Sequence, residues 1–276
     1  PVETHFDLCL ATIRARCAVI CEKPLAANTG QAVALQQAAA EASVPTAVNF
    51  TYRSAPGYRL SERLLAVPGF GRPLHAEFAL LQGHNFLPGY PRASALLDSG
   101  VHLFDTVISL CDLAGLGHLA EVSAAPMVEV DTQQWREHAS GEAGPDFGWG
   151  FLARTTSGAI VSATFSRAAL GWRNGLRWSL YGEDGAIAVE LDAGRTEARL
   201  SRRGDERPQG MWRPIPVPPD LLADDARFPQ YHLDRLVGAL RGDEPFPGFA
   251  AAVATHRLAD ALATSAATRR WVAVER

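Results

Sequence analysis

The sequence has little of several features that mark whole classes of proteins. Four cysteines in 276 residues are too few for a disulfide framework, which favours a reducing compartment. No uncharged apolar run reaches the roughly 18 residues that a membrane helix needs, and no basic-then-apolar signal peptide is found. The 26 basic and 30 acidic residues nearly balance, so nothing marks a surface for nucleic acid or anionic lipid. These absences predict a cytoplasmic protein that binds neither nucleic acid nor membranes.

Hydrophobic residues make up 47% of the chain, enough to bury sizeable cores, and the first fifty residues alternate between helix and strand patterns. Residues 3–16 have the apolar spacing of an amphipathic helix. The apolar run 17–21 is typical of a strand covered on both faces of a parallel sheet. Asn28 or Thr29 can cap the next helix, and a second strand is expected at 45–50. Strand, helix and strand together predict a βαβ unit.

After Thr51 the pattern becomes that of a broad, mostly antiparallel sheet. Residues 72–82 resemble a long strand, and residues 97–113 resemble an amphipathic helix. Further strand-like runs occupy 119–130, 147–156, 159–167, 175–182, 185–191 and 195–202. Turn sequences at 156–158 and 183–185 separate neighbouring runs as in hairpins. Alternation of apolar and polar residues within these strands predicts a sheet with one polar face.

The last quarter of the chain is expected to be mainly helical. Residues 204–226 are rich in Pro, Asp and Arg and indicate a long exposed connection. Two helices are predicted at 228–241 and 249–268, before a short apolar tail at 271–274. The fold class is therefore α/β plus α+β, with part of a parallel sheet followed by a larger domain built on a broad, mostly antiparallel sheet.

The first candidate site is Glu22-Lys23-Pro24, directly after the apolar run 17–21. Ligands of open α/β sheets bind beyond the carboxyl ends of the strands, which is where Lys23 is expected. A lysine there can hold a hydroxyl or carbonyl oxygen and stabilise developing negative charge. Pro24 removes a backbone donor and restricts the conformation of the turn. The alternative is a solvated charged turn, since Lys and Pro are common in loops.

The second candidate site is the segment from Asp98 to Asp105, on the helix expected at 97–113. Asp98 and His102 are i,i+4 neighbours, and a carboxylate beside an imidazole sets its tautomer and raises its basicity. Such a pair suits general acid/base chemistry near neutral pH. Gly100 is unfavourable in a first helical turn, so it is expected to mark a close approach of backbone to ligand. The alternative is Asp98 as a helix N-cap and His102 as an ordinary half-buried histidine.

Other motifs carry less weight. Residues 115–120 match G-x-G-x-x-A, but a helix precedes and a strand follows, the reverse of a dinucleotide-binding turn. His5 and Cys9 are i,i+4 neighbours, yet no CxxC pair occurs, and strand alternation places Cys17 and Cys21 together as buried packing residues. No metal site is therefore predicted. The sequence also lacks a G-x-S-x-G nucleophile turn, and Cys21 is expected to be buried rather than reactive.

Taken in order along the chain, these motifs resemble the Gfo/Idh/MocA family of nicotinamide-dependent oxidoreductases over nearly the whole sequence. The segments that carry the resemblance are Pro1-Val2-Glu3-Thr4-His5, Cys21-Glu22-Lys23-Pro24, Asn49-Phe50-Thr51-Tyr52-Arg53, the D-x-G-x-H-x-x-D pattern from Asp98 to Asp105, Pro247-Gly248-Phe249, and the stretch 265–272. The resemblance implies three parts. These are a partial dinucleotide-binding (Rossmann) domain at 1–50, an α+β substrate and oligomerisation domain at 51–246, and a C-terminal helix and tail at 247–276 that pack back on the Rossmann part.

The resemblance also implies roles for individual residues. Lys23 would hydrogen-bond the reacting hydroxyl beside the nicotinamide, while Glu22, Pro24 and His5 would line the cofactor side. His102 would be the acid/base that takes the hydroxyl proton. Asp98 would orient His102 and the substrate. Arg53 would contact substrate or cofactor.

One departure from the family pattern stands out in the sequence. The family's G-x-G-x-x-G loop and the residue that selects NAD or NADP are missing, because the chain starts near the fourth strand of a Rossmann domain. The pyrophosphate would lack its helix N-terminus, so we expect these 276 residues to bind NAD or NADP poorly. A fluorescence titration with micromolar NAD(P)H affinity would contradict that expectation.

The resulting functional prediction is an NAD(P)-dependent oxidoreductase acting on a CH–OH group of a sugar, cyclitol or similar polyol. Retention of Lys23, Asp98 and His102 together favours dehydrogenation. A non-catalytic ligand sensor or regulator on the same fold, and an NAD-dependent redox-assisted glycosidase, remain as alternatives. The protein is expected to form a homodimer or homotetramer through the sheet, with substrate contacts from loops near 83–92 and 168–175.

Overall fold

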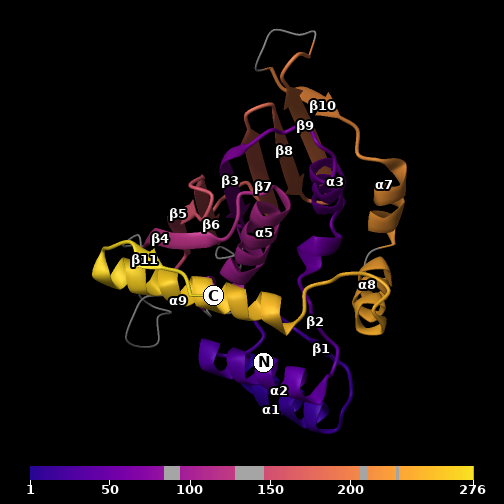
Figure 1. The fold of residues 1–276 in the computed structure, drawn as a ribbon, viewed down its shortest axis with the longest axis vertical. Coiled ribbons are helices and arrows are strands. Elements are labelled where there is room, and N and C mark those ends of the chain that lie inside the picture. Colours follow the sequence, from indigo (N-terminus) through magenta and orange to yellow (C-terminus); the bar gives the residue numbers. More distant parts are fainter. Residues whose placement is uncertain (84–93, 128–145, 206–210, 228–229, 276) are drawn as a thin grey trace.

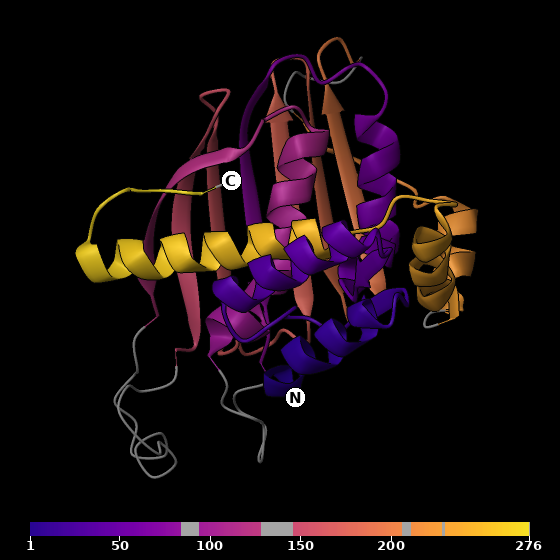
Figure 2. The ribbon, with the colours of Figure 1, turned by 60° about the horizontal axis from the view of Figure 1, so that its bottom comes forward.

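The computed structural model describes residues 1–83, 94–127, 146–205, 211–227 and 230–275, which form two sheets of very different size (Figure 1). One sheet pairs two short parallel strands beside the N-terminal helices, and the other has nine strands. A long C-terminal helix lies between the N-terminal unit and the large sheet in both ribbon views (Figures 1 and 2).

The N-terminal unit is the predicted βαβ unit preceded by a helix. Its elements are α1 (Val2–Arg14), β1 (Val19–Cys21), α2 (Thr29–Ala42) and β2 (Thr46–Val48). The strands pair in parallel, with Val19 opposite Thr46 and Cys21 opposite Val48. The side chain of Asn28 accepts a hydrogen bond from the Gln31 amide, so Asn28 is the residue that caps α2.

Two details of β1 differ from the sequence prediction. The strand has three residues, and Ile20 on one of its faces is 39% exposed, so it is not covered on both faces by the described residues. Cys17 was expected to be buried on the side of Cys21, but Cys17 is exposed. The reason is that Cys17 precedes the strand, so the period-two alternation that buries Val19 and Cys21 does not reach it.

The large sheet is mostly antiparallel, as predicted. Its strands are β3 (Pro73–Leu81), β4 (Leu119–Pro126), β5 (Gly148–Thr155), β6 (Ile160–Ser166), β7 (Gly175–Gly182), β8 (Gly185–Asp192), β9 (Arg195–Arg202), β10 (Arg213–Ile215) and β11 (Val272–Ala273). Their order is β10-β9-β8-β7-β3-β6-β5-β4-β11, and the β3–β6 pair is parallel. Both predicted hairpins, β5–β6 and β7–β8, are present.

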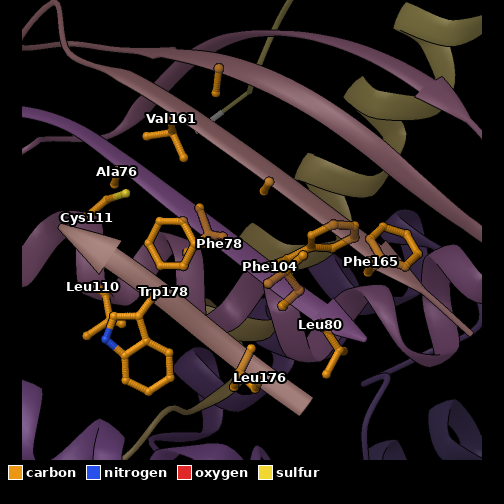
Figure 3. Close-up of a cluster of buried hydrophobic side chains, with 14 of the residues drawn as sticks. Ala76, Phe78, Leu80, Phe104, Leu110, Cys111, Val161, Phe165, Leu176 and Trp178 are labelled. Atoms are coloured by element: carbon orange, nitrogen blue, oxygen red, sulfur yellow. The ribbon is translucent and has the colours of Figure 1, made fainter. Parts of the chain in front are cut away.

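One face of the large sheet is covered by helices and contains the main core (Figure 2). The covering helices include α3 (Pro56–Leu65), α5 (Gly100–Leu113) and α9 (Phe249–Thr268). In the core, the Phe104 and Phe165 rings meet edge to face with centroids 5.7 Å apart (Figure 3). Trp178 is 1% exposed, and its indole N–H donates a hydrogen bond to Ser61. Along β6, Val161, Ala163 and Phe165 are buried, while the intervening Ser162 and Thr164 face the other way.

The C-terminal third contains more structure than its composition predicts. Residues 204–226, expected to be an exposed connection, include the edge strand β10 and the helix α7 (Pro219–Ala226). Pro219 occupies the first turn of α7, where proline is tolerated because that amide has no helical partner. The predicted helices are confirmed as α8 (Gln230–Arg241) and α9.

The last helix and tail connect the two sheets. Helix α9 contacts α2 of the N-terminal unit and also α5 and β4 of the larger domain. The apolar tail adds β11 to the edge of the large sheet, where Val272 pairs with Val122. None of the helices in the described part of the chain is both long and apolar enough to cross a membrane.

Candidate active site

Lys23 lies just beyond the carboxyl end of β1 and points to the larger domain. Its ammonium Nζ donates hydrogen bonds to Asp98 Oδ1 and to the Asp98 carbonyl, both at 2.8 Å. Behind it, His5 Nδ1 donates to the Pro24 carbonyl at 2.9 Å and joins α1 to the same turn. Lys23 is also the only lysine in the sequence, since every other basic residue is arginine. The one flexible ammonium of the protein is therefore used to connect its two sheets.

Asp98 is positioned by a break between two helices. Helix α4 (Ala95–Asp98) ends at this residue, and α5 begins at Gly100 after Ser99. The Asp98 carboxylate binds Lys23 and also lies 3.4 Å from Arg167 Nη1. Burial opposes ionisation of Asp98, but the hydrogen bond and charge of Lys23 and the charge of Arg167 outweigh it, and the pKa of Asp98 is lowered. Asp98 is thus an anion between two cations, and its interpretation as a helix N-cap is wrong.

Arg167 is a contributor that the sequence did not reveal. It follows β6, its side chain is 1% exposed, and its Nη2 donates to the Asp146 carbonyl at 3.1 Å. A buried guanidinium is costly unless it is paired, so Asp98 and Arg167 stabilise each other's charged states. An arginine after a strand has no local signal that separates it from a surface residue.

His102 lies on α5, one turn beyond Asp98, and is half-buried. Its ring and the Tyr52 ring are perpendicular, with centroids 5.2 Å apart. Its Nδ1 is buried and has no hydrogen-bond partner among the described residues. Burial, reinforced by the charge of Lys23, lowers the pKa of His102 to about 3 even though the charge of Asp98 acts in the other direction. The imidazole is therefore neutral at physiological pH.

The expected contact between Asp98 and His102 is absent. The Asp98 carboxylate is directed at Lys23 and Arg167, and no hydrogen bond joins it to the imidazole within the described ranges. Asp98 therefore does not hold the imidazole through a hydrogen bond, although its charge still acts to raise the pKa of His102 against the larger effect of burial. An i,i+4 spacing brings two side chains within reach, but the stronger opposite charges of the two cations decide where the carboxylate points.

A cavity of about 530 Å³ brings the predicted residues together. It is lined by Lys23, Thr51, Tyr52, Ala55, Gln82, Asp98, Ser99, His102, Asn174, Gly194 and Asp225. Gln82 donates to the Asn174 side chain at 2.5 Å and accepts from Ser99 at 2.8 Å, which fixes the amide that faces the cavity. Asn174 comes from the expected loop 168–175, whereas residues 84–92 lie outside the described residues.

Glu22 and Arg53 are engaged elsewhere. Glu22 is exposed and accepts a hydrogen bond from Asn49 Nδ2 at 2.6 Å. The guanidinium of Arg53 binds both oxygens of Asp105, at 2.6 and 2.8 Å, and does not line the cavity of Lys23. Arg53 therefore holds η1 (Thr51–Ser54) against α5, behind the cavity rather than in it.

Gly100 has a packing reason instead of the expected ligand-related one. A Cβ at this position would lie 2.9 Å from the Phe104 ring and 3.1 Å from the Phe165 ring. The glycine lets the start of α5 approach β6 closely. This packing accounts for the glycine without any contact to a ligand. Among the residues described, no group of three His, Cys, Asp or Glu side chains converges on a possible metal position.

Known proteins are similar to this chain in both sequence and fold. Residues 1–50 match the model of an oxidoreductase family with an NAD-binding Rossmann fold. Levoglucosan dehydrogenase of Pseudarthrobacter phenanthrenivorans is 25% identical over 308 residues, which cover 99% of this chain and 78% of that protein. Inositol 2-dehydrogenase of Acidothermus cellulolyticus is 29% identical over 273 residues, 96% of this chain and 72% of that protein.

The structural similarity extends over the entire chain. The crystal structure of an NAD-binding oxidoreductase from Klebsiella pneumoniae superimposes with a TM-score of 0.82 at 25% identity, covering 100% of this chain and 78% of that one. The family match covers the turn that carries Lys23, and the two relatives and this structure extend the similarity over the residues that carry His102. Residues 1–50 thus match the Gfo/Idh/MocA oxidoreductase model, and the whole chain is similar in sequence and fold to NAD-binding oxidoreductases and dehydrogenases.

Proposed function

We propose that this protein is an NAD(P)-dependent dehydrogenase that oxidises a CH–OH group of a sugar, cyclitol or similar polyol. The observation that carries the proposal is the pairing of the Lys23 ammonium and the neutral His102 imidazole in one cavity at the carboxyl end of β1. The names of the two relatives, a levoglucosan dehydrogenase and an inositol 2-dehydrogenase, support the substrate class.

The residues present fit the nicotinamide end of a dinucleotide. The turn after β1 stands where open α/β sheets bind such ligands, and His5 holds it from behind through Pro24. His102 adds a buried ring nitrogen with no partner in the described residues, a polar atom suited to a bound ligand. Lys23, Pro24 and His102 would border the nicotinamide ring. When bound, the oxidised nicotinamide supplies a hydride acceptor at its C4 carbon.

The charges of the site suit removal of a proton from a substrate hydroxyl and of a hydride from the carbon that bears it. Lys23, held by Asp98, donates a hydrogen bond to the substrate hydroxyl and stabilises the negative charge that develops on its oxygen. His102 is neutral and accepts the hydroxyl proton while the hydride leaves the carbon, so the alcohol becomes a ketone. Asp98, ionised between Lys23 and Arg167, keeps the ammonium pointing into the cavity.

A matched pair of histidine variants tests the proposal. Because the 276 residues lack the G-x-G-x-x-G loop, the assay uses saturating millimolar NAD⁺ or NADP⁺, and under these conditions we expect purified protein to oxidise at least one of myo-inositol, levoglucosan and glucose. His102→Ala should lower kcat about 10²–10⁴-fold, the range of a lost general base. His118→Ala, in an exposed loop away from the cavity, should leave kcat unchanged. Turnover that survives in His102→Ala, with intact circular dichroism, would contradict the role of His102, and no turnover with any substrate would contradict the function.

We also propose a cytoplasmic location and a homodimer or homotetramer formed through the open face of the large sheet. Support comes from the side chains on that face, where His75 and Tyr181 stack at 4.2 Å and Trp212 packs edge-on against Tyr181. These rings border a hollow of about 550 Å³ that also contains Glu77, Arg177 and Arg199. Light scattering of the wild type and of Tyr181→Glu tests this, with a smaller particle expected for the variant.

A further inference from the structure

The cavity of Lys23 and His102 continues into a second one. The outer cavity measures about 450 Å³ and is lined by Tyr52, Ala55, Pro56, Arg173, Asn174, Leu191, Asp192, Ala193, Gly194, Arg195, Thr196 and Asp225. Five of these residues also line the inner cavity, namely Tyr52, Ala55, Asn174, Gly194 and Asp225. Each cavity alone falls within the roughly 300–1,000 Å³ of a small-molecule site. The two therefore form one cleft that extends beyond Lys23 and His102, neither of which lines the second cavity.

The residues shared by the two cavities form the junction between them, and side-chain contacts or the large sheet hold them in place. The side chain of Asn174 is bound by Gln82, and the Asn174 amide donates to Asp192 Oδ1 at 3.2 Å. Tyr52 has one side of its ring against His102. Gly194 lies in the turn between β8 and β9, which brings that hairpin to the outer cavity. The junction is thus built from both the reacting end and the sheet.

The outer cavity has charged side chains in its lining, and their charges balance. Arg173 and Arg195 contribute positive charge, and Asp192 and Asp225 contribute negative charge. A phosphate group would meet both carboxylates, and an ammonium group would meet both guanidinium groups, so neither charge is favoured. Planar amide, carboxylate and guanidinium groups beside a Tyr ring instead match a neutral ring that carries several hydroxyls, since they donate and accept hydrogen bonds in turn.

We propose that the substrate class is a neutral two-ring sugar, a disaccharide or glycoside. One ring lies against Lys23 and His102, and the second occupies the outer cavity among Arg173, Asp192 and Asp225. This inference rests on the proposed function, because the reacting ring is the one that the dehydrogenase oxidises. It adds that the outer cavity supplies binding energy that a single ring cannot use.

The test compares the binding of neutral sugars that have one ring with that of neutral sugars that have two. Isothermal titration calorimetry, with and without NAD⁺, measures the affinity for glucose and myo-inositol against maltose, cellobiose and trehalose. At least one two-ring sugar should bind about tenfold more tightly than either single ring, as one or two charge-assisted hydrogen bonds allow. Arg173→Ala and Asp192→Asn should each weaken that two-ring sugar about tenfold and leave single rings within about twofold. Asn at position 192 keeps the oxygen that accepts from Asn174, so the junction is preserved.

Arg72→Ala is the matched control, since Arg72 is an exposed arginine on another turn, paired with Glu183, and it should change neither affinity. Equal affinity for one and two rings, or variants that weaken both sizes alike, would overturn the inference while single-ring oxidation still supports the dehydrogenase. If no sugar of either size binds or is oxidised, the proposed function fails and this inference fails with it.

Discussion

The two sheets of this protein differ sharply in how much structure supports each functional side chain. Lys23 follows a strand of three residues that pairs with another of the same length. Asp98, His102 and Arg167 belong to a domain whose sheet has nine strands and a large buried core. The proposed reacting centre therefore combines a side chain from a lightly built unit with three from a heavily built one.

The small N-terminal unit is positioned mainly by its contacts with the larger domain. Lys23 is fixed by Asp98, and Asn49 after β2 receives a hydrogen bond from His232 of α8. Thr29 at the start of α2 donates to Asp260 of α9 at 2.5 Å. Loss of these cross-contacts should affect the placement of Lys23 more than any change within its own short strand.

The largest expected effect comes from removing the ammonium itself. Lys23→Met keeps most of the side-chain length but cannot donate to the substrate oxygen, and kcat/KM should fall about 10²–10³-fold, as for loss of a donor to a developing oxyanion. Glu22→Gln, the neighbouring exposed residue, should change kcat/KM by no more than about threefold, because its partner Asn49 can still donate to the amide oxygen. Initial-rate kinetics of both variants would contradict the assignment if Glu22→Gln were the more damaging.

The core of the large domain should respond next most strongly. Phe104 is fully buried between Phe151 and Phe165. Phe104→Ala should lower the free energy of unfolding by about 3–5 kcal/mol, the usual cost of such a cavity. Urea denaturation followed by circular dichroism measures it, and a loss below about 1 kcal/mol would show that this core does not stabilise the protein.

A matched change in the small unit sharpens the contrast. Leu35, on α2, is fully buried, and Leu35→Ala should lower the free energy of unfolding by about 2–5 kcal/mol. Hydrogen exchange should accelerate in α1, α2, β1 and β2, whereas β6 and β7 should keep their protection, because stability is not uniform over the structure. Equal acceleration in both sheets would mean that the two regions open as one.

Gly100 gives a smaller effect at the contact between α5 and β6. Gly100→Ala places a methyl group 2.9 Å from the Phe104 ring, and the overpacking should cost about 1–3 kcal/mol despite the better helix propensity of alanine. The same denaturation assay measures the change. A stabilised variant would mean that the Phe104 and Phe165 rings can move aside without cost, which would contradict the expected overpacking.

The smallest effect concerns pH and two histidines whose pKa values are lowered by burial, His102 and His256. The pKa of His102 is about 3 here against an ordinary 6.5, and burial also lowers the pKa of His256. Between these values the unfolded chain binds more protons than the folded one, so stability is present near neutral pH and is lost as the pH falls from about 6.5 towards 3. His256→Gln should reduce that slope, by at most about 1.4 kcal/mol per pH unit. Denaturation at pH 7 and pH 5 checks it, and an unchanged slope would contradict it.

Local patterns predicted the parts of the fold that depend on local physics. The cap at Asn28, the turn at Thr156-Ser157-Gly158 and helix α9 follow from propensity and periodicity, and all three are present. Lys23, Asp98 and His102 were also expected to meet, and they line one cavity.

The remaining features depend on contacts between distant segments. Arg167 matters because it faces a carboxylate 69 residues away in sequence, and Gly100 is needed because of a ring on β6. The Asp98 carboxylate pairs with Lys23 and Arg167 rather than with His102, and the i,i+4 spacing of Asp98 and His102 does not reveal this. Arg53 was expected at the ligand but is held by Asp105, a pairing that appears only when η1 packs on α5.

One lysine makes the central claim directly measurable. In protein labelled with ¹³C and ¹⁵N only in lysine, Lys23 gives a single side-chain signal, and we propose that its ammonium binds the substrate hydroxyl while Asp98 holds it. Addition of an oxidisable sugar or cyclitol with NAD⁺ should shift this signal in a saturable way, and Asp98→Asn should shift it without ligand. If the enzyme oxidises the added substrate but the Lys23 signal shifts neither with that substrate nor in Asp98→Asn, the account is contradicted.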